Sequence, residues 1–326
     1  MTTAGTSAPY DPELAAALAA IPPDVLTKLS SSGIATGREM IATMFPVLTN
    51  AELRRDGAID VDEQQVPGPA GDPDVSLLIL RPVGRTAPVP AIYHIHGGGM
   101  IMGHNRFGIA ELVDYVVELG VAVVSVEYRL SPEHPHPAPI EDCYAGLVWT
   151  AEHAADLGID PSRLLLFGGS AGGGLAAALA LLARDRGGPD LSHQILLCPM
   201  LDDREITQSS REYDGLGVWD PAANRLGWTS LLGDARGGPD VPPYAAPSRA
   251  ADLSGLPPAY VDVGSAEIFR DEAIDYAARL VRAGVSVELH MWAGGFHGFE
   301  SLAPYAAVTK DAAAARLNYL HRQLGV

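Results

Sequence analysis

The sequence predicts an α/β protein built on a mostly parallel eight-stranded sheet that is flanked by helices. Eight stretches have the composition of strands, and several are continuous apolar runs, the pattern of strands buried on both faces of a parallel sheet. Helical stretches lie between most of them, and this alternation is typical of a doubly wound sheet with right-handed crossovers. Of the 326 residues, 47% are hydrophobic, which is enough for a large buried core.

The chain begins with a helical region that precedes the first strand. Asp11 supplies an N-cap acceptor, Pro12 fits the first helical position, and Glu13 favours the positive end of the helix dipole. Thr36 and Glu39 have the spacing of a capping box, which predicts the start of a second helix.

Strands and helices then alternate along most of the chain. Short β-rich runs bounded by turn residues predict strands at residues 61–66, 74–81, 91–95, 121–127, 163–167, 193–198, 259–263 and 285–292. Longer stretches between them predict helices at residues 110–119, 140–157, 171–186, 271–283 and about 303–324.

One interval interrupts this alternation. Residues 199–258 are rich in Pro and Gly and contain no clear strand, yet a structureless loop of that length is uncommon in a compact domain. Residues 221–232 have a helical pattern. We therefore expect an insertion at about residues 201–245 that joins the helices of residues 1–50 as a helical cap on a main domain of residues 51–326.

Composition argues against several classes of partner. Lys and Arg number 22 and Asp and Glu 40, a net charge of −18, so nucleic acid and anionic membranes are expected to repel the protein. No basic segment precedes the first apolar stretch, and no apolar run is long enough to span a bilayer, so a cytoplasmic protein is expected. Two cysteines, Cys143 and Cys198, do not make a disulfide framework and are expected to be free thiols.

A serine turn follows the strand at residues 163–167. Residues 168–172 (GGSAG) match G-x-S-x-G and lead into an alanine-rich helix, a context that raises the serine hydroxyl above the sheet edge. The turn brings strand and helix close together, so Gly168 and Gly172 must be small. The alternatives are a turn that only packs, or a phosphate-binding loop; no Lys-Ser/Thr follows, which excludes a Walker loop. We predict that Ser170 is a nucleophile.

A second glycine-rich segment, residues 96–99 (HGGG), ends the strand at residues 91–95. Successive glycines let backbone N–H groups point into a cavity, where fixed donors stabilise a developing oxyanion. The alternative is an ordinary flexible loop. His94 and His96 also form an H-x-H pair, but no third ligand with suitable spacing is evident, so no metal site is expected.

A hydrolytic serine needs a base, and His297 is the best placed of ten histidines. It lies in residues 294–299 (GGFHGF), just after the strand at residues 285–292. Open α/β sheets build their sites at the carboxyl edge, and flanking glycines allow a loop to present the imidazole there. The alternative is a histidine on a surface loop.

The base in turn needs an acidic partner to hold its tautomer. Enzymes that carry the G-x-S-x-G turn on an α/β sheet place the acid between the serine and the histidine in chain order, so the acid is expected near the end of the strand at residues 259–263. Glu267 lies in the loop that follows and is the preferred candidate. Asp271 is the reserve, because it is expected in the next helix, whereas Asp262 lies inside the strand.

Five motifs in this order resemble the hormone-sensitive-lipase-like branch of the α/β-hydrolases, also called bacterial family IV esterases. They are HGGG at 96–99, YRLSPEHPHP at 128–137, GGSAGG at 168–173, SAEIFRDE at 265–272 and HGF at 297–299, and the likeness extends from about residue 89 to 299. Two positions depart from the family pattern. Gly169 stands where Asp is usual, which concerns the support of the site, and Glu267 stands where Asp is commoner, which concerns its geometry.

The resemblance implies an α/β-hydrolase fold with a helical cap and assigns roles to single residues. Ser170 would be the nucleophile, His297 the general base and acid, and Glu267 the orienting acid. The backbone N–H groups of Gly98, Gly99 and Ala171 would bind the oxyanion. It also implies that the YRLSPEHPHP segment is mainly structural and braces the site.

These observations predict a serine carboxylesterase that acts on small-molecule esters of short to medium acyl chain, without metal or organic cofactor. A lactonase, amidase or acyltransferase would use the same triad, and a non-catalytic binding protein on the same scaffold is a more distant alternative. Tyr213, Trp219 and Trp228 are candidate walls of the substrate pocket, with packing inside the cap as the alternative. The sequence leaves monomer and homodimer equally open.

Overall fold

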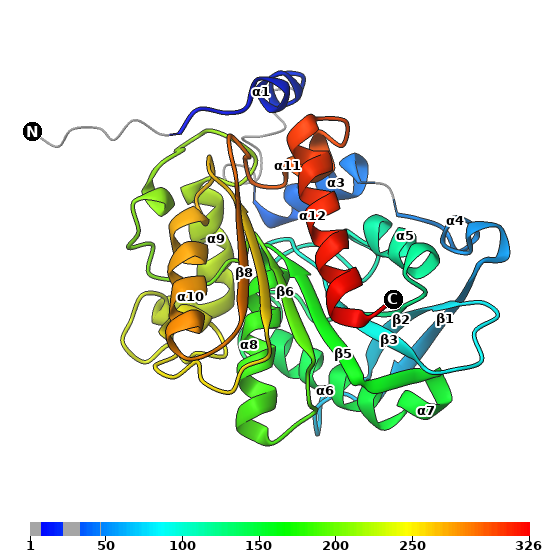
Figure 1. Ribbon diagram of the computed structural model, residues 1–326. Helices are drawn as coiled ribbons and strands as arrows, with labels where there is room; N and C mark the ends of the chain where they lie inside the picture. The colour runs from blue at the N-terminus through cyan, green and yellow to red at the C-terminus, as the bar shows by residue number, and fades with distance from the viewer. Residues whose placement is uncertain (1–7, 22–32, 46) are drawn as a thin grey trace, which may run out of the picture.

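A twisted sheet of eight strands organises the fold. In the computed structural model, which describes residues 8–21, 33–45 and 47–326, the strand order is β1-β2-β4-β3-β5-β6-β7-β8 (Figure 1). β2 pairs antiparallel with both of its neighbours, and all pairs from β4 through β8 are parallel. The strands are Ile59–Val66 (β1), Val75–Pro82 (β2), Val89–Ile95 (β3), Ala122–Glu127 (β4), Ile159–Gly169 (β5), His193–Leu197 (β6), Ala259–Gly264 (β7) and Val287–Trp292 (β8). The predicted α/β fold with a mostly parallel eight-stranded sheet is confirmed, as is each predicted strand.

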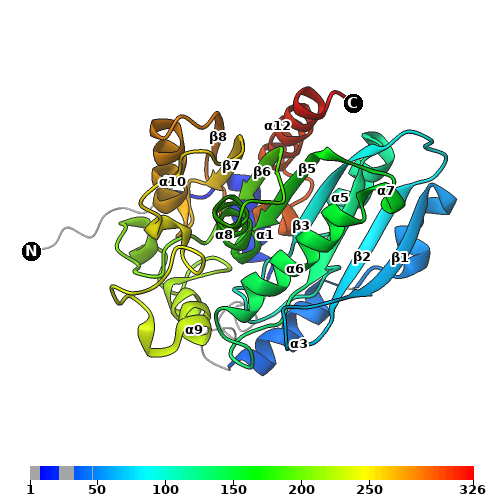
Figure 2. The same cartoon turned by 90° about the horizontal axis from the view of Figure 1, so that it is seen from below.

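Helices cover both faces of the sheet (Figure 2). One face packs against α5 and α12, and the other against α6, α8 and α10. Their bounds are Ala110–Glu118 (α5), Ala138–Glu152 (α6), Ala171–Arg186 (α8), Arg270–Arg282 (α10) and Ala307–Leu324 (α12). Successive strand side chains point to opposite faces, so Leu78 and Leu80 of β2 join the first layer and Leu77 and Ile79 join the second.

Two predicted helices have different bounds in the structure. The helix expected at 140–157 is divided at His153 into α6 and the short α7, Ala154–Leu157. The C-terminal helix begins at Ala307 rather than near residue 303, and a separate short helix, α11 (Phe299–Leu302), precedes it. Ala303 adopts a non-helical conformation, which fits the steric restriction on a residue before proline.

The two predicted N-terminal helix starts have different outcomes. Asp11 caps α1 (Pro12–Ala19) as expected, because its Oδ1 accepts the N–H groups of Glu13 and Leu14 at 2.8 and 3.3 Å. The capping box predicted at Thr36 is wrong: Thr36 lies inside α3 (Ile34–Met44), which begins after Gly33. Gly33 has φ +86°, so a left-handed glycine turn, rather than a side-chain cap, precedes that helix.

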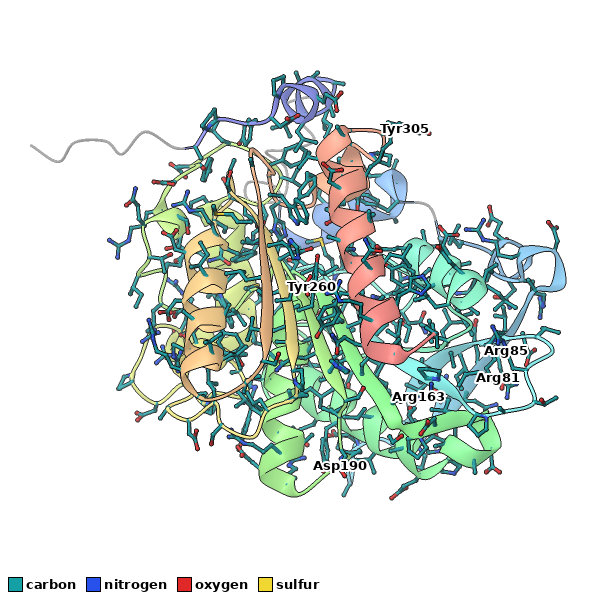
Figure 3. The ribbon with its side chains drawn as sticks, in the orientation of Figure 1. Arg81, Arg85, Arg163, Asp190, Tyr260 and Tyr305 are labelled. Carbon is teal, nitrogen blue, oxygen red and sulfur yellow. The ribbon has the colours of Figure 1, made fainter. Side chains whose placement is uncertain are left out.

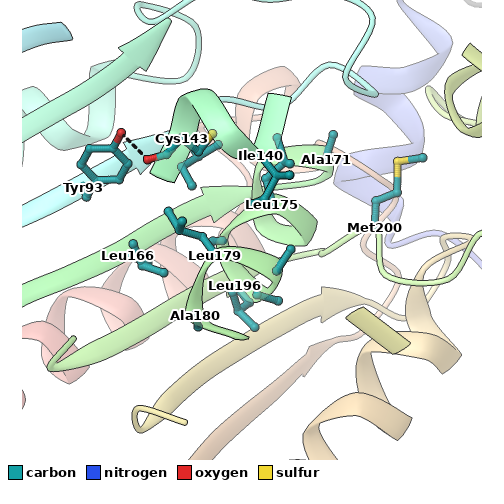
Figure 4. Packing of buried hydrophobic residues seen from close by; sticks show 14 of the residues in the cluster. Tyr93, Ile140, Cys143, Leu166, Ala171, Leu175, Leu179, Ala180, Leu196 and Met200 are labelled. Carbon is teal, nitrogen blue, oxygen red and sulfur yellow. Dashed lines mark hydrogen bonds between the residues drawn. The ribbon is translucent and has the colours of Figure 1, made fainter. Parts of the chain in front are cut away.

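Helix α8 lies close against the strands that flank it. Gly173, Gly174 and a series of alanines give it a thin surface, and its Leu175 and Leu179 are buried in the same cluster as Leu166 of β5 (Figure 4). In the same core, the hydroxyl of Tyr93 on β3 donates a hydrogen bond to the carbonyl of Cys143 on α6 (Figure 4). This packing holds the start of α8 firmly at the carboxyl edge of the sheet.

The region after β6 contains α9 (Pro221–Leu232), and no strand is present among the described residues of the interval 199–258. Trp228 of α9 is completely buried. The Tyr213 hydroxyl accepts the N–H of Ala8 at 3.0 Å, and the Tyr213 ring stacks on Tyr10 at 6.3 Å. The described part of the N-terminal region therefore contacts the interval after β6; residues 22–32 lie outside the described residues.

The described helices do not combine the length and apolar character needed to cross a bilayer. Both cysteines are free thiols, as predicted: Cys143 is buried, and Cys198 is partly exposed.

Candidate active site

Ser170 occupies the sharp turn between β5 and α8. Its backbone has φ 58° and ψ −123°, a combination that residues with a side chain rarely adopt. The turn is held by hydrogen bonds on both sides of the serine: its N–H donates to Leu197 O at 2.8 Å, and its carbonyl accepts the N–H groups of Gly174 and Met200, each at 3.0 Å. The strained conformation is thus fixed by its neighbours.

The glycines around Ser170 are required by close backbone approach. A Cβ on Gly168 would overlap the Gly172 carbonyl oxygen, and a Cβ on Gly172 would overlap the Ile95 carbonyl oxygen. These are the two positions that the sequence pattern marks as necessarily small. Both contacts are to backbone atoms, so a side chain at either position would have to move the turn itself.

The structure brings Ser170, His297 and Glu267 together, although 127 and 30 residues separate the two bonded pairs in the chain. His297 Nε2 lies 3.0 Å from Ser170 Oγ, and His297 Nδ1 lies 2.6 Å from Glu267 Oε2. The other oxygen of Glu267 accepts the N–H of Gly264 at 3.0 Å. Because Nδ1 faces a carboxylate, it carries the proton and donates, which leaves Nε2 free to accept from the serine hydroxyl.

Asp271 and Asp262, the two alternatives to Glu267 in the sequence, have other partners. Asp271 accepts the N–H of Ser209 at 2.8 Å and the Nε–H of Arg270 at 2.7 Å. Asp262 lies 3.5 Å from the Nη2 of Arg316. Only Glu267 is within hydrogen-bond distance of the imidazole of His297 among the described acidic residues.

The HGGG segment passes beside the serine. A Cβ built on Gly97 would lie 3.5 Å from Ser170 Cβ. Gly98 and Gly99 have φ +108° and +62°, and a Cβ on Gly99 would overlap the Trp219 ring. In the described part of the chain, the N–H groups of Gly98, Gly99 and Ala171 donate to no protein acceptor. They are therefore available to bind an oxygen atom that enters the site beside Ser170.

The predicted bracing segment contacts this loop directly. The Tyr128 hydroxyl donates to His96 O at 2.9 Å, and its ring stacks on the His96 ring at 4.1 Å. Burial lowers the pKa of His96 to about 3 and that of His94 to about 3, so both are neutral. His94 Nδ1 pairs with Ser125 Oγ at 2.8 Å, and neither histidine belongs to a group of potential metal ligands among the described residues.

Of the three aromatic residues considered as pocket walls, one lies at the site. Trp219 covers Gly99, and its ring centroid is 6.4 Å from that of His297. Trp228 is fully buried, and Tyr213 packs on Tyr10, so these two contribute to packing.

Sequence reasoning missed a buried arginine that supports the histidine loop. The guanidinium of Arg316 in α12 is 1% exposed and donates to Glu111 at 2.6 Å and to both oxygens of Glu300 at 2.7 and 2.6 Å. Glu300 lies three residues after His297 in α11. A signal was present: Arg316 follows Ala312 by four residues, on the face of the predicted helix that is apolar and buried.

Arg316 also lies beside Asp262, a buried acid whose pKa is raised. Burial raises the pKa of Asp262 from its ordinary value of 3.8 to about 7; Arg316 opposes this rise and Glu300 adds to it. Tyr260, on the same strand as Asp262, is buried (Figure 3). Its ring centroid lies 5.2 Å from that of Tyr319 in α12. The buried Arg316 therefore joins α11, which follows His297, to α5 and β7 through the carboxyl groups of Glu300, Glu111 and Asp262.

Comparisons with known proteins agree with this architecture. A family model described as the α/β hydrolase fold matches residues 92–301. Carboxylesterase NlhH of Mycobacterium tuberculosis is 36% identical over 273 residues, which cover 80% of this chain and 82% of that protein. Esterase LipI of the same organism is 34% identical over 317 residues, covering 96% of this chain and 94% of its own.

Solved structures give the same result. A bacterial heroin esterase superposes with a TM-score of 0.87 at 42% identity, covering 97% of this chain and 98% of that one. A thermostable esterase from Pseudomonas putida superposes with a TM-score of 0.85 at 29% identity, covering 99% of both chains. The resemblance predicted from the motifs is confirmed, and the chain belongs to the hormone-sensitive-lipase-like branch of the α/β-hydrolase family.

Proposed function

We propose that this protein is a serine carboxylesterase that hydrolyses small-molecule carboxylic esters. The observation that carries the proposal is the continuous series of hydrogen bonds from Glu267 through His297 to Ser170. This arrangement can make a serine hydroxyl nucleophilic at neutral pH, because a neutral imidazole accepts its proton while a carboxylate stabilises the resulting imidazolium. The esterase names of the relatives support the choice of ester substrates.

The first half of the reaction forms an acyl-enzyme. Ser170 Oγ attacks the ester carbonyl carbon as its proton passes to His297 Nε2. The carbonyl oxygen becomes an oxyanion that accepts hydrogen bonds from the N–H groups of Gly98, Gly99 and Ala171, and these fixed donors need no reorganisation as charge develops. The tetrahedral intermediate then collapses: the bond to the alkoxy oxygen breaks, and His297 gives its proton to the departing alcohol.

The second half releases the acid by the same groups. Water donates a proton to His297 Nε2 and attacks the acyl carbon, and the same backbone donors bind the second oxyanion. The bond to Ser170 Oγ breaks, and His297 returns the proton to the serine. No redox change occurs, and the balance is ester plus water to acid plus alcohol.

A cap is part of the proposal. Residues 1–50 and about 201–245 would cover the carboxyl edge of the main domain, residues 51–326, which the contacts of Ala8 and Tyr10 with Tyr213 support. Trp219 above Gly99 narrows the space next to the serine. We infer from this bulk that short to medium acyl chains fit better than long ones.

The test is hydrolysis of p-nitrophenyl esters from acetate to dodecanoate by the wild type and by Ser170→Ala. We expect turnover that declines along the series and a variant that loses at least about 10³-fold in kcat. A fluorophosphonate probe should label the wild type and leave the variant unlabelled. Faster turnover of lactones or anilides, or transfer to an added alcohol, would instead identify a lactonase, an amidase or an acyltransferase. A variant as fast as the wild type would refute the serine mechanism.

A further inference from the structure

A cysteine lies beside the acid and the base. The Sγ of Cys198, a carboxylate oxygen of Glu267 and an imidazole nitrogen of His297 all lie within 4.8 Å of one another. Cys198 directly follows β6, has φ 36°, and donates its N–H to Asp262 O at 2.7 Å, so the backbone of β7 fixes its position. Cys198, Glu267 and His297 are the only group of three potential metal ligands among the described residues. The mechanism above does not use the sulfur of Cys198.

The three ligand types are those that zinc prefers: thiolate, imidazole and carboxylate. Tetrahedral coordination at normal bond lengths requires ligand atoms about 3.3–3.6 Å apart. His297 Nδ1 and Glu267 Oε2 are 2.6 Å apart, so they would have to separate by less than about 1 Å to admit a metal ion. Glu267 and His297 are 3% and 9% exposed, which distinguishes this group from the acidic clusters common on protein surfaces.

The geometry decides which imidazole nitrogen is available. Nε2 lies 3.0 Å from Ser170 Oγ, whereas Nδ1 faces Glu267. A cation that binds both Glu267 and His297 must therefore take Nδ1. We propose that Cys198 Sγ, Glu267 Oε2 and His297 Nδ1 form an inhibitory site for a thiophilic divalent cation of the Zn²⁺ class. The inference goes beyond the proposed function and uses esterase activity only as one readout.

The proton balance explains why occupancy would inhibit. The Cys198 thiol releases its proton to solvent when sulfur binds the metal. The imidazole stays neutral, but its single proton moves from Nδ1 to Nε2, because the metal now occupies Nδ1. An Nε2 that carries a proton cannot accept one from Ser170. His297 therefore no longer acts as the base, although Ser170 and the oxyanion donors are unchanged.

Two kinetic consequences follow. Inhibition lowers kcat and leaves KM unchanged, because the metal lies behind the imidazole and away from the substrate. It also strengthens as pH rises, because one proton is released for each ion bound.

The binding experiment is calorimetric titration of Zn²⁺ into the full-length protein and three variants. Cys198→Ser removes the sulfur, and Cys143→Ser is the matched control because Cys143 is the chain's only other cysteine. Ser170→Ala removes the nucleophile and keeps the three ligands. We expect the wild type, Cys143→Ser and Ser170→Ala to bind one Zn²⁺ with equal affinity, and Cys198→Ser to bind at least about tenfold more weakly. Equal affinity in Cys198→Ser and the wild type would overturn the proposal.

Two further measurements keep the proposal testable if Cys198→Ser does not fold or if the protein hydrolyses no ester. Cd²⁺ added to the wild type and to Cys143→Ser should produce the same thiolate-to-cadmium ultraviolet absorption; its absence from the wild type would also overturn the proposal, even if Cys198→Ser does not fold. Zn²⁺ should lower kcat of the wild type and of Cys143→Ser reversibly, with recovery in EDTA, each compared with its own metal-free rate. If the protein hydrolyses no ester, the binding results still decide the metal site.

Discussion

Arg316 of α12 donates to both carboxylate oxygens of Glu300, at 2.7 and 2.6 Å, and Glu300 lies three residues after His297. The same guanidinium lies within 3.5 Å of Asp262 on β7, the strand that leads to Glu267. One buried cation therefore links the C-terminal helix to the two segments that present the imidazole and its carboxylate.

Replacing this cation should cost stability. Arg316→Met leaves Glu300 and Asp262 without their positive partner, and because Glu300 keeps some contact with solvent, a loss of about 3 kcal/mol in the free energy of unfolding is expected. Arg322→Met is the matched control, since Arg322 is on the same helix with its side chain 53% exposed, and it should cost less than about 1 kcal/mol. Urea denaturation of both variants measures the difference; equal losses would contradict the role of Arg316.

The raised pKa of Asp262 predicts how stability depends on pH. The folded state keeps a proton on Asp262 up to about pH 7, whereas the ordinary pKa of 3.8 applies when the chain is unfolded. Its contribution to the free energy of unfolding is therefore fully present below about pH 4 and is lost as pH rises through 7. Asp262→Asn keeps the uncharged state at all pH values. Its stability relative to the wild type should therefore rise between roughly pH 4 and pH 7 and then level off, as measured by urea denaturation; a constant difference would contradict the shift.

The choice of orienting acid can be tested directly. Glu267→Gln puts an amide next to His297 Nδ1 and no longer favours the productive tautomer, so kcat should fall by about 10³–10⁴. Asp271→Asn is the comparison, because Asp271 bonds Ser209 and Arg270 instead of the imidazole. It should change kcat by less than about tenfold. Steady-state kinetics with p-nitrophenyl butyrate decides; similar losses in the two variants would argue against Glu267.

Alanine substitutions at Gly99 and Gly158 distinguish the effect of backbone strain from that of displaced oxyanion donors. Both have positive φ, +62° and +68°, but a Cβ on Gly99 would overlap Trp219, whereas one on Gly158 meets nothing within 4 Å. Gly158→Ala should cost about 1–2 kcal/mol of stability with little change in kcat. Gly99→Ala should also lower kcat, by about 10²–10³, because it displaces donor groups. Thermal melts and kcat together measure both effects; unchanged kcat in Gly99→Ala would exclude that role.

Arg38 connects α3 to the loop that carries the glycines. Its Nε donates to Ile101 O at 2.7 Å, and its two terminal nitrogens bond Glu133 at 2.7 and 2.8 Å. Exposed ion pairs contribute little, so Glu133→Gln should change KM less than about twofold. Arg38→Ala also removes the bond to Ile101 and should raise KM several-fold. Kinetics with p-nitrophenyl butyrate test this, and identical KM values in both variants would show that α3 does not position the loop.

Local patterns predicted most of the fold. All eight strands were predicted within a few residues, because apolar runs and bounding turn residues act over short distances in the chain. The errors have local causes as well. Thr36 has suitable spacing for a cap, but Gly33 begins the helix earlier, and Pro304 delays the last helix beyond Ala303. Spacing alone does not reveal which of two adjacent signals prevails.

The sequence by itself determined the strand order in the chain, the serine turn and the candidate groups of the site, because each depends on neighbouring residues. Only the tertiary structure decided which carboxylate meets His297, since Glu267 and Asp271 are four residues apart and their separation in space depends on where α10 begins. It alone revealed Cys198 beside the same imidazole and Arg316 beneath its loop. Such contacts join segments distant in the chain, and their geometry is set by the packing of strands and helices around the core.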